Sequence, residues 1–531
     1  MALHIYFTTD VHGNYFSQDF RYQRDGDGGL ERVYGFMESQ RALYGRENVI
    51  LIDGGDMIQG GPEAYYLNHI QKVREHGIGL MTKFVGYDAG TVGNHDIESG
   101  RNTLKRFKRD CGYPLLSANI TDKRRSHPFA PYTILERGGK RIALVGFTTP
   151  ATKHWLPGDV CRAYDFRDII VSALDWSGQI QAVEHPDLMI AVLHSGWEGG
   201  LHTRNWDEHV ARQFAESVNG FDLVLYGHDH FSRNETVKSS KGRDVVCLNA
   251  SCYGYEIAEA VVSFDGNGEH HIKGILHDIR SFRNEHSDRF RQHFSHYYKQ
   301  ISDYTSTVLG TLKTPLKISD AYMGPSAYMT LLHQLQLHVS GADISLCSPY
   351  FTDSEIPPGP FTVAELYTIY WFEDRLYTIR MKGKEIKNLL ERSYDLWTRT
   401  RKRSYTPLLK ATTDKKTGEL QFENLFFHFD NAAGIDYEVD THKKHGRKIR
   451  ILQLSDGRPF NPEAEYTVAT IANRALDGGG MMTLGAGISP KELRKRIVSY
   501  TRHDIRYYLR EYIEEMGVVK VETMNNWKFL L

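Results

Sequence analysis

Residues Phe7–Phe16 read FTTDVHGNYF, directly after an apolar run that begins at Leu3. The apolar run predicts a buried strand, and the Gly-Asn pair within the quoted stretch predicts a turn at its end. Strand side chains alternate with a period of two, so Asp10 and His12 are expected to point to the same side. Taken alone, the stretch also fits an aspartate that bonds its own turn and a histidine on the surface.

Four further apolar segments end in side chains that can bind a metal ion. Parallel-type sheets bind ligands at the carboxyl ends of their strands, and adjoining glycines let the backbone approach a bound ion closely. Oxygen and imidazole donors without thiolate suit divalent Mn, Zn, Fe, Co or Ni. The donors are Asp56 in VILIDGGD, Asn94 and His95 in GNHDIE, His194 in IAVLHSG, and His228 and His230 in LVLYGHDH.

The first 280 or so residues alternate apolar strands with helical patterns, which predicts a layered α/β domain. Helices are expected at Leu30–Leu43 and Trp206–Val218, so His209 is interpreted as a surface or packing residue. Strands are expected at Val49–Ile52, Arg141–Gly146, Leu188–Leu193 and Phe221–Tyr226.

A chain of 531 residues is too long for one ordinary core, so at least two domains are expected. We predict a catalytic domain over residues 1–282, a linking helix over 283–307 and a second α+β domain over 308–531. The second domain is expected to contain a helix at Gly324–Val339 and a strand at Leu376–Met381.

Composition excludes several classes of function. With 40% hydrophobic residues, 25% charged residues and a net charge of -1, no overall field favours a nucleic-acid polymer or an anionic membrane. No stretch approaches the roughly 18 apolar residues of a membrane helix. The five scattered cysteines indicate neither a disulfide framework nor a thiolate metal site.

No partner protein is indicated by the sequence. The chain as it stands is expected in the cytoplasm, whereas a removed leader would place it in the periplasm or outside the cell.

The ordered set D-x-H, G-D, G-N-H-[DE], H and G-H-x-H resembles that of the calcineurin-like metallophosphoesterases over about the first 260 residues. This resemblance implies an αββα sandwich. The remaining chain resembles the nucleotidase C-terminal domain of 5'-nucleotidases, UDP-sugar hydrolases and 2',3'-cyclic-nucleotide phosphodiesterase/3'-nucleotidases. That second resemblance is carried by IPPGPFTVAELYTIYWFEDRLYTIRMKGKEIKNLL and EYTVATIANRALDGGG, and the early FRYQRDGDGGLERV leans toward the cyclic-nucleotide branch.

The resemblance implies two divalent metal ions that share one carboxylate. Two such cations can clamp the attacking and leaving oxygens of an in-line displacement, and they activate the attacking water. One ion is implied to bind Asp10, His12 and His230, the other Asn94, His194 and His228, with Asp56 bridging both.

In relatives, the histidine after the metal-binding asparagine stabilises the transition state or protonates the leaving group. That position is His95 here. A carboxylate three residues later orients the histidine in relatives, and Glu98 stands at that position where an aspartate is commoner. Asp96 replaces the commoner glutamate beside the histidine, so both carboxylates remain candidates for orienting it.

Nucleotidases of this type hold the base between two aromatic rings and hold other substrate groups with arginines. The segment FFHFDNAAGIDYEVD places Phe427 at the first aromatic position, but the second position is Asn473. The arginine expected after Cys347 is absent from SPYFTDSE, where Tyr350 or Phe351 could supply a second ring.

Three functions remain after this comparison. The first is two-metal hydrolysis of nucleotide phosphoesters, of the 5'-nucleotidase or 2',3'-cyclic-nucleotide phosphodiesterase/3'-nucleotidase type, on a small-molecule substrate. The second is hydrolysis of a non-nucleotide phosphoester, which the missing aromatic favours. The third is an inactive metal-binding sensor, against which the complete ligand set argues.

Overall fold

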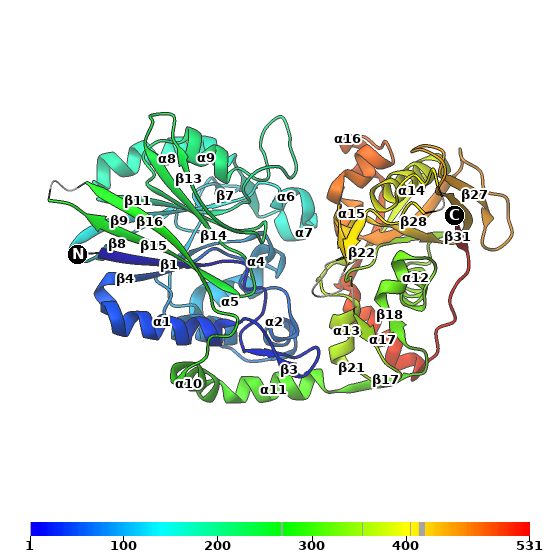
Figure 1. Ribbon diagram of the computed structural model, residues 1–531, viewed down its shortest axis with the longest axis horizontal. Helices are drawn as coiled ribbons and strands as arrows, with labels where there is room; N and C mark the ends of the chain where they lie inside the picture. Colours follow the sequence, from blue (N-terminus) through cyan, green and yellow to red (C-terminus); the bar gives the residue numbers. More distant parts are fainter. Residues whose placement is uncertain (1, 267–268, 353, 404, 414–419) are drawn as a thin grey trace. The chain divides into compact units, whose positions relative to one another are not determined.

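The computed structural model describes residues 2–266, 269–352, 354–403, 405–413 and 420–531. The chain divides into two compact units, Met1–Tyr304 and Thr305–Leu531. The first unit runs from blue to green in Figure 1 and the second from green to red. The segment predicted as one linking helix contains two, α10 (Glu285–His293) and α11 (Ser295–Thr305).

The first unit contains two six-stranded sheets, ordered β16-β15-β1-β4-β5-β6 and β13-β14-β12-β11-β9-β8. In the first sheet, β1, β4, β5 and β6 are parallel neighbours. In the second sheet, β9, β11, β12 and β14 are parallel neighbours. The strands of the first sheet are β1 (Ala2–Thr8), β4 (Val49–Asp53), β5 (Ala89–Thr91), β6 (Leu115–Leu116), β15 (Glu256–Phe264) and β16 (His270–Asp278). Those of the second are β8 (Tyr132–Arg137), β9 (Lys140–Thr148), β11 (Leu188–His194), β12 (Leu223–Tyr226), β13 (Ser232–Lys238) and β14 (Asp244–Ala250).

The alternation of side chains along β1 explains the layers. Leu3, Ile5 and Phe7 pack with apolar side chains of the second sheet in one buried cluster. Tyr6 points to the opposite face, as the period of two requires, and joins a cluster with helical residues. The two sheets therefore pack face to face, with helices outside, and the predicted αββα sandwich is confirmed. The outer helices include α1 (Leu30–Tyr44), α3 (Gly77–Val85) and α10 on one side, and α8 (Ile169–Glu184) and α9 (Ala211–Ser217) on the other.

The predicted helix at Trp206–Val218 is wrong in its first part, because α9 begins only at Ala211. The backbone N–H of Glu208 donates to the Leu201 carbonyl at 2.9 Å, which is not a helical pairing. The N–H of Val210 donates to Ser195 Oγ at 3.1 Å. These contacts hold residues 206–210 in a loop between β11 and α9.

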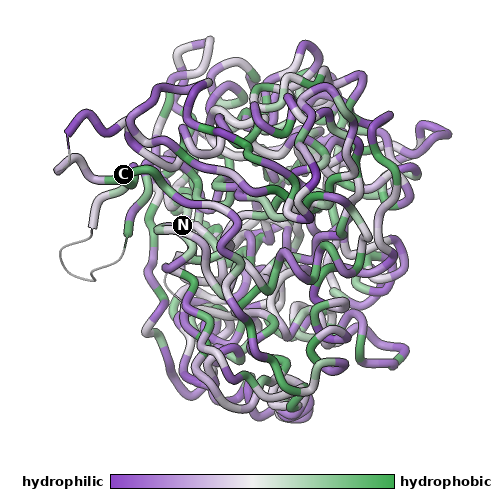
Figure 2. Tube along the Cα trace, turned by 90° about the vertical axis from the view of Figure 1, so that its right-hand side faces the viewer, coloured by the Kyte–Doolittle hydropathy of each residue, from purple (hydrophilic) through white to green (hydrophobic). Residues whose placement is uncertain are grey.

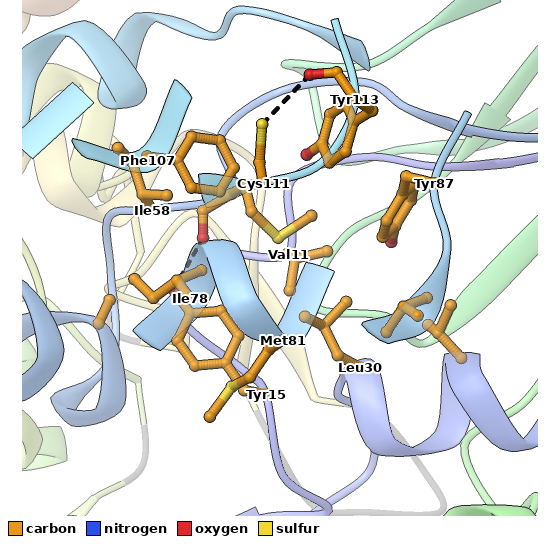
Figure 3. Close-up of a cluster of buried hydrophobic side chains, with 14 of the residues drawn as sticks. Val11, Tyr15, Leu30, Ile58, Ile78, Met81, Tyr87, Phe107, Cys111 and Tyr113 are labelled. Atoms are coloured by element: carbon orange, nitrogen blue, oxygen red, sulfur yellow. Dashed lines mark hydrogen bonds between the residues drawn. The ribbon is translucent and has the colours of Figure 1, made fainter. Parts of the chain in front are cut away.

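A buried cluster lies beneath the loops that follow β1 and β4 (Figure 3). Val11 belongs to it and is fully buried, although both its neighbours in sequence are polar. Tyr15 donates its hydroxyl to the Met57 carbonyl at 2.9 Å and so ties the two loops together. Cys111 points its thiol at the Tyr113 carbonyl at 3.2 Å, and burial raises the pKa of this thiol to about 11. The cluster anchors both loops.

The second unit is α+β, as predicted. Its largest sheet has the order β25-β19-β28-β22-β29 and mixes parallel and antiparallel pairs. Trp397 and Tyr394 are fully buried in its core. Most protruding loops of the molecule are hydrophilic (Figure 2). The strands are β19 (Ile344–Cys347), β22 (Arg375–Lys382), β25 (Asn431–Ala433), β28 (Glu465–Ile471) and β29 (Ile497–Asp504), and the long helices are α12 (Ala327–Ser340), α14 (Gly383–Trp397) and α17 (Ile505–Met516).

Candidate metal centre

The predicted metal-binding side chains of the first unit follow the carboxyl ends of five parallel strands, β1, β4, β5, β11 and β12. The loops after β1 and β4 are joined directly by backbone hydrogen bonds. Asp10 N–H donates to the Gly55 carbonyl, and His12 N–H donates to the Asp56 carbonyl, both at 3.0 Å. The loop positions are therefore set by the backbone.

Asp10, His12 and His230 form one group whose donor atoms all lie within 4.8 Å of one another. His12 Nε2 and His230 Nε2 are 3.1 Å apart, and they lie 3.7 Å and 3.4 Å from Asp10 Oδ1. Two imidazole nitrogens and a carboxylate oxygen thus converge on one point.

Asp56, His194 and His228 form a second group with the same spacing. His194 Nε2 lies 3.0 Å from Asp56 Oδ2 and 3.0 Å from Asn94 Oδ1, so the asparagine joins this group. Asp56 Oδ2 is also 3.8 Å from His12 Nε2. One carboxylate therefore lies between the two groups.

Five of these seven residues have a left-handed backbone. The φ angles are 53° at Asp10, 48° at His12, 55° at Asp56, 79° at His228 and 63° at His230. Each such conformation costs a non-glycine residue on the order of 1–3 kcal/mol and persists only where the surroundings hold it. Conformations of this kind cluster at functional sites, which supports a shared role for the five.

The residues fit a pair of divalent cations. Asp10 Oδ1 is buried and has no hydrogen-bond partner among the described residues. A Cβ at Gly93 would lie 2.0 Å from Asp56 Oδ1, and one at Gly227 would lie 2.5 Å from Asp10 Oδ2. Both carboxylates therefore need glycine beside them, and their oxygens face the histidines.

At two of the ligand-type histidines, His12 and His194, the other ring nitrogen has its own acceptor, as is usual for metal-binding histidines. His12 Nδ1 lies 3.1 Å from the Gln59 carbonyl, and His194 Nδ1 lies 2.8 Å from the Gly54 carbonyl. Both rings therefore offer Nε2 to the site. His228 differs, because its Nε2 lies 3.1 Å from Glu208 Oε1.

His95 lies at the edge of the same site, with its ring 5.3 Å from the His12 ring. Of the two carboxylates that the sequence left open, Glu98 contacts the histidine, with Oε2 2.5 Å from Nδ1. Asp96 instead accepts the backbone N–H groups of Gly93, Asp56, Met57 and Ile58 at 2.8–3.1 Å. Asp96 thus fixes the Asp56 loop, and Glu98 is the carboxylate that contacts His95.

The carboxylates of this region shift the pKa of His95 upward. Burial alone would lower its pKa, but Asp56 and Glu98 outweigh this and raise the pKa to about 9. At Asp96, burial and the neighbouring Asp56 charge raise the pKa to about 6 despite the backbone donors. The backbone N–H of His95 also donates to Asp56 Oδ1 at 2.8 Å.

Two residues that the sequence interpretation missed support the centre. Asp229, between His228 and His230, accepts the Trp197 N–H at 2.8 Å and the Asn249 side-chain amide at 2.7 Å. Its place inside the His-x-His motif is the signal that could have identified it. Glu208 carried no such signal, because it lay within a segment with a helical pattern.

In the second unit, Phe427 belongs to a short helix, Phe426–His428, and its ring is half-buried. Its backbone carbonyl accepts from Ser348 Oγ at 2.9 Å and from Arg474 Nη2 at 2.7 Å. Asn473 directly precedes that arginine. A Cβ at Gly478 would lie 1.9 Å from Asn473 Oδ1, so the amide packs on this glycine.

Phe426 and His428, which flank Phe427 in the sequence, line a cavity of about 510 Å³. Phe427 itself is not among the lining residues. Tyr350 is buried against Tyr370, with ring centroids 4.3 Å apart, so it presents no exposed ring. Burial, together with the charges of Arg474 and Arg392, lowers the pKa of His428 to about 3. The lining residues are Thr352, Arg392, Leu396, Leu420, Phe422, Glu423, Asn424, Leu425, Phe426, His428 and Gly479.

Two groups of nitrogen and oxygen donors lie on either side of one carboxylate, at the strand ends of an αββα sandwich. This arrangement defines the first unit as a metallophosphoesterase domain. A family model described as calcineurin-like phosphoesterase matches residues 3–232, and one described as 5'-nucleotidase, C-terminal domain, matches residues 307–486. The chain belongs to the calcineurin-like phosphoesterases that carry a 5'-nucleotidase C-terminal domain, and this family uses divalent metals.

Similar proteins span both units. The trifunctional nucleotide phosphoesterase protein YfkN of Bacillus subtilis is 23% identical over 99% of this chain, but the match covers only 38% of that longer protein. A 2',3'-cyclic-nucleotide 2'-phosphodiesterase/3'-nucleotidase of Haemophilus influenzae is 24% identical over 99% of this chain and 87% of its own length. A Staphylococcus aureus structure in complex with alpha-ketoglutarate shares the fold, with a TM-score of 0.80, 19% identity and complete coverage of both chains.

Among the described residues, no helix combines the length and the apolar character needed to cross a bilayer.

Proposed function

We propose that the protein hydrolyses phosphoesters of nucleotides at two divalent cations. The observation that carries this proposal is the position of Asp56 Oδ2, 3.0 Å from His194 Nε2 and 3.8 Å from His12 Nε2. A carboxylate placed between two groups of donors is suited to bridge two cations. Asp10, His12 and His230 would hold one cation, Asn94, His194 and His228 would hold the other, and Asp56 would serve both.

When bound, the two cations supply Lewis-acid stabilisation of the phosphoryl oxygens and activate water for attack. His95 supplies the proton. Glu98 accepts the Nδ1–H of His95, which leaves Nε2 to protonate the oxygen of the departing group. Asp96 holds the Asp56 loop through four backbone N–H groups and takes no part in proton transfer.

A nucleotide is the proposed substrate for two reasons. The Bacillus and Haemophilus relatives are named for nucleotide substrates. The half-buried ring of Phe427 also provides a flat surface for a base, with its backbone fixed by Ser348 and Arg474. Asn473, next to Arg474, would contribute a polar contact where relatives have a second ring.

Hydrolysis of a non-nucleotide phosphoester is the second candidate, and Asn473 favours it. A hydrolysis panel tests both. It contains nucleoside 5'-monophosphates, 3'-monophosphates, 2',3'-cyclic nucleotides, sugar phosphates and nitrophenyl phosphate, each with Mn, Zn, Fe, Co or Ni. We expect nucleotides to give the highest kcat/KM. If the other esters are hydrolysed but nucleotides are not, nucleotides are rejected as the substrate. If no ester in the panel is hydrolysed, the proposed phosphoesterase activity is rejected.

A further inference from the structure

Glu208 is a carboxylate beside the candidate metal centre that the proposed function does not yet use. Its Oε1 lies 3.1 Å from Nε2 of His228 and 3.1 Å from Nε2 of His209. Only 12% of the Glu208 side chain is exposed, and 10% of that of His228. The pair is therefore shielded from water, where a charged hydrogen bond has its largest effect.

The loop at Gly200 and Leu201 holds the side chain of Glu208 in place. The N–H of Leu201 donates to Oε2 at 2.7 Å, while the N–H of Glu208 donates back to the Leu201 carbonyl at 2.9 Å. Gly200 has φ +70°, and a Cβ there would lie 2.7 Å from Glu208 Oε2. The loop thus needs glycine at this position to bring the carboxylate to His228.

The backbone of Glu208 is tied to the strand that carries His194. Ser195, the residue after His194, donates its hydroxyl to the Glu208 carbonyl at 2.6 Å. Thr149 donates to the same carbonyl at 3.1 Å. Glu208 therefore bonds through its backbone to the residue that follows His194, and through its side chain to His228. Both histidines are proposed ligands of the same cation.

His228 is oriented differently from the other two histidines described above. His12 and His194 direct Nδ1 to neutral backbone carbonyls. His228 directs Nε2 to a carboxylate, and its ring is stacked against Trp155 with centroids 5.5 Å apart. With Nε2 engaged, Nδ1 is the nitrogen that remains for a cation. A charged acceptor raises the basicity of a metal-binding imidazole, and losing such a partner typically costs 10–100-fold in metal affinity or activity.

We propose that Glu208 is a positioning residue for the cation held by Asp56, Asn94, His194 and His228. Its carboxylate fixes His228 in the tautomer that carries the proton on Nε2 and offers Nδ1 to the cation. It strengthens this site and leaves the site of Asp10, His12 and His230 unaffected. This inference rests on the metal centre of the proposed function.

Calorimetric titration of the metal-free full-length protein with Mn²⁺ tests the inference without measuring turnover. We expect the wild type to bind two ions. Glu208→Gln should weaken one of the two dissociation constants about 10- to 100-fold and leave the other unchanged within about two-fold. Glu208→Asp, which keeps the charge, should recover part of the loss. The unfolding temperature of the metal-free variants should match that of the wild type.

The matched control is Glu198→Gln, because Glu198 is an exposed glutamate in the same loop and pairs with Arg212. It should bind both ions like the wild type. If Glu208→Gln also binds both ions like the wild type, the inference fails and the two-metal proposal stands. If the wild type binds no ions, the proposed function itself fails. Three ions in the wild type but two in Glu208→Gln and His209→Gln would overturn the positioning role, because Glu208 would then be a direct ligand.

Discussion

The loops of the metal centre and the Phe427 segment are held in place by different kinds of contact. Around Asp10 and Asp56, neighbouring strand ends exchange backbone hydrogen bonds, and glycines make room for the carboxylates. Phe427 depends on side chains from distant parts of the sequence, Ser348 and Arg474. A site whose loops are fixed by backbone hydrogen bonds should therefore lose its function completely when a ligand side chain changes, whereas a site fixed by side-chain contacts should weaken by degrees.

The largest effect is expected at the carboxylate between the two donor groups. Asp56→Asn removes the charge shared by both cations, so turnover should fall to the background rate. The measurement is kcat with nitrophenyl phosphate under chelator-controlled Mn²⁺, with the metal content of the same sample as a second readout. Turnover like that of the wild type would contradict the bridging role.

Loss of the proton donor should cost less than loss of the bridge. His95→Asn should lower kcat roughly 10²–10⁴-fold, the usual range for one positioned acid or base, while the metal content stays the same. The loss should shrink for nitrophenyl esters, whose leaving group needs little protonation. Glu98→Gln should give a milder form of the same pattern, because the histidine then keeps a neutral partner. An equal loss for good and poor leaving groups would leave His95 only an electrostatic role.

Acid should loosen the second unit at a buried histidine. His333 bonds to Ser345 at 2.8 Å and Asn431 at 2.6 Å, both neutral, and burial lowers its pKa to about 4. The unfolded value is about 6.5, so the unfolded chain binds the proton more readily. The stabilisation is complete above pH 6.5 and is lost as the pH falls through 4. The loss between pH 7 and pH 4 should be about 3 kcal/mol.

Hydrogen exchange of peptides from α12 and β19 at pH 7 and pH 4 measures this loss. His333→Gln should have a smaller pH dependence than the wild type, whereas the exposed His445→Gln should match the wild type. The same pH dependence in all three proteins would assign the effect to other groups.

The smallest effect is expected at the ring proposed to hold the base. Stacking of a base on an aromatic side chain is worth about 1–3 kcal/mol. Phe427→Ala should therefore raise KM for a nucleotide roughly 5- to 150-fold, toward the low end because Asn473 provides no second ring. Nitrophenyl phosphate, which has no base, should be hydrolysed as before. If both substrates suffer alike, Phe427 is a packing residue.

The layered fold could be predicted because Leu3, Ile5 and Phe7 alternate with polar or helix-facing residues, a local pattern that the structure follows directly. The convergence of donors also followed from strand order. The choice between Asp96 and Glu98 needed the local helix Asn94–Glu98, where residues three apart share a face and adjacent residues do not.

Glu208 could not be predicted, because its position depends on the left-handed backbone at Gly200 and on Ser195, thirteen residues away. Phe427 and Asn473 rested on resemblance alone, and the Phe427 carbonyl is held by Arg474, 47 residues away. Periodicity carries no information about such contacts. The same applies to Tyr350, whose burial against Tyr370 is a tertiary feature.

The left-handed backbone at the proposed ligands lowers the stability of the metal-free protein. The residues concerned are Asp10, His12, Asp56, His228 and His230. Glycine adopts this conformation without strain, so glycine at His12, His228 or His230 would relieve backbone strain on the order of 1 kcal/mol or more in the metal-free protein. Each such exchange would also remove a proposed ligand. Laboratory evolution that selected only for heat resistance of the metal-free chain would therefore drift toward glycine here and erase the centre, a direct trade-off between stability and activity.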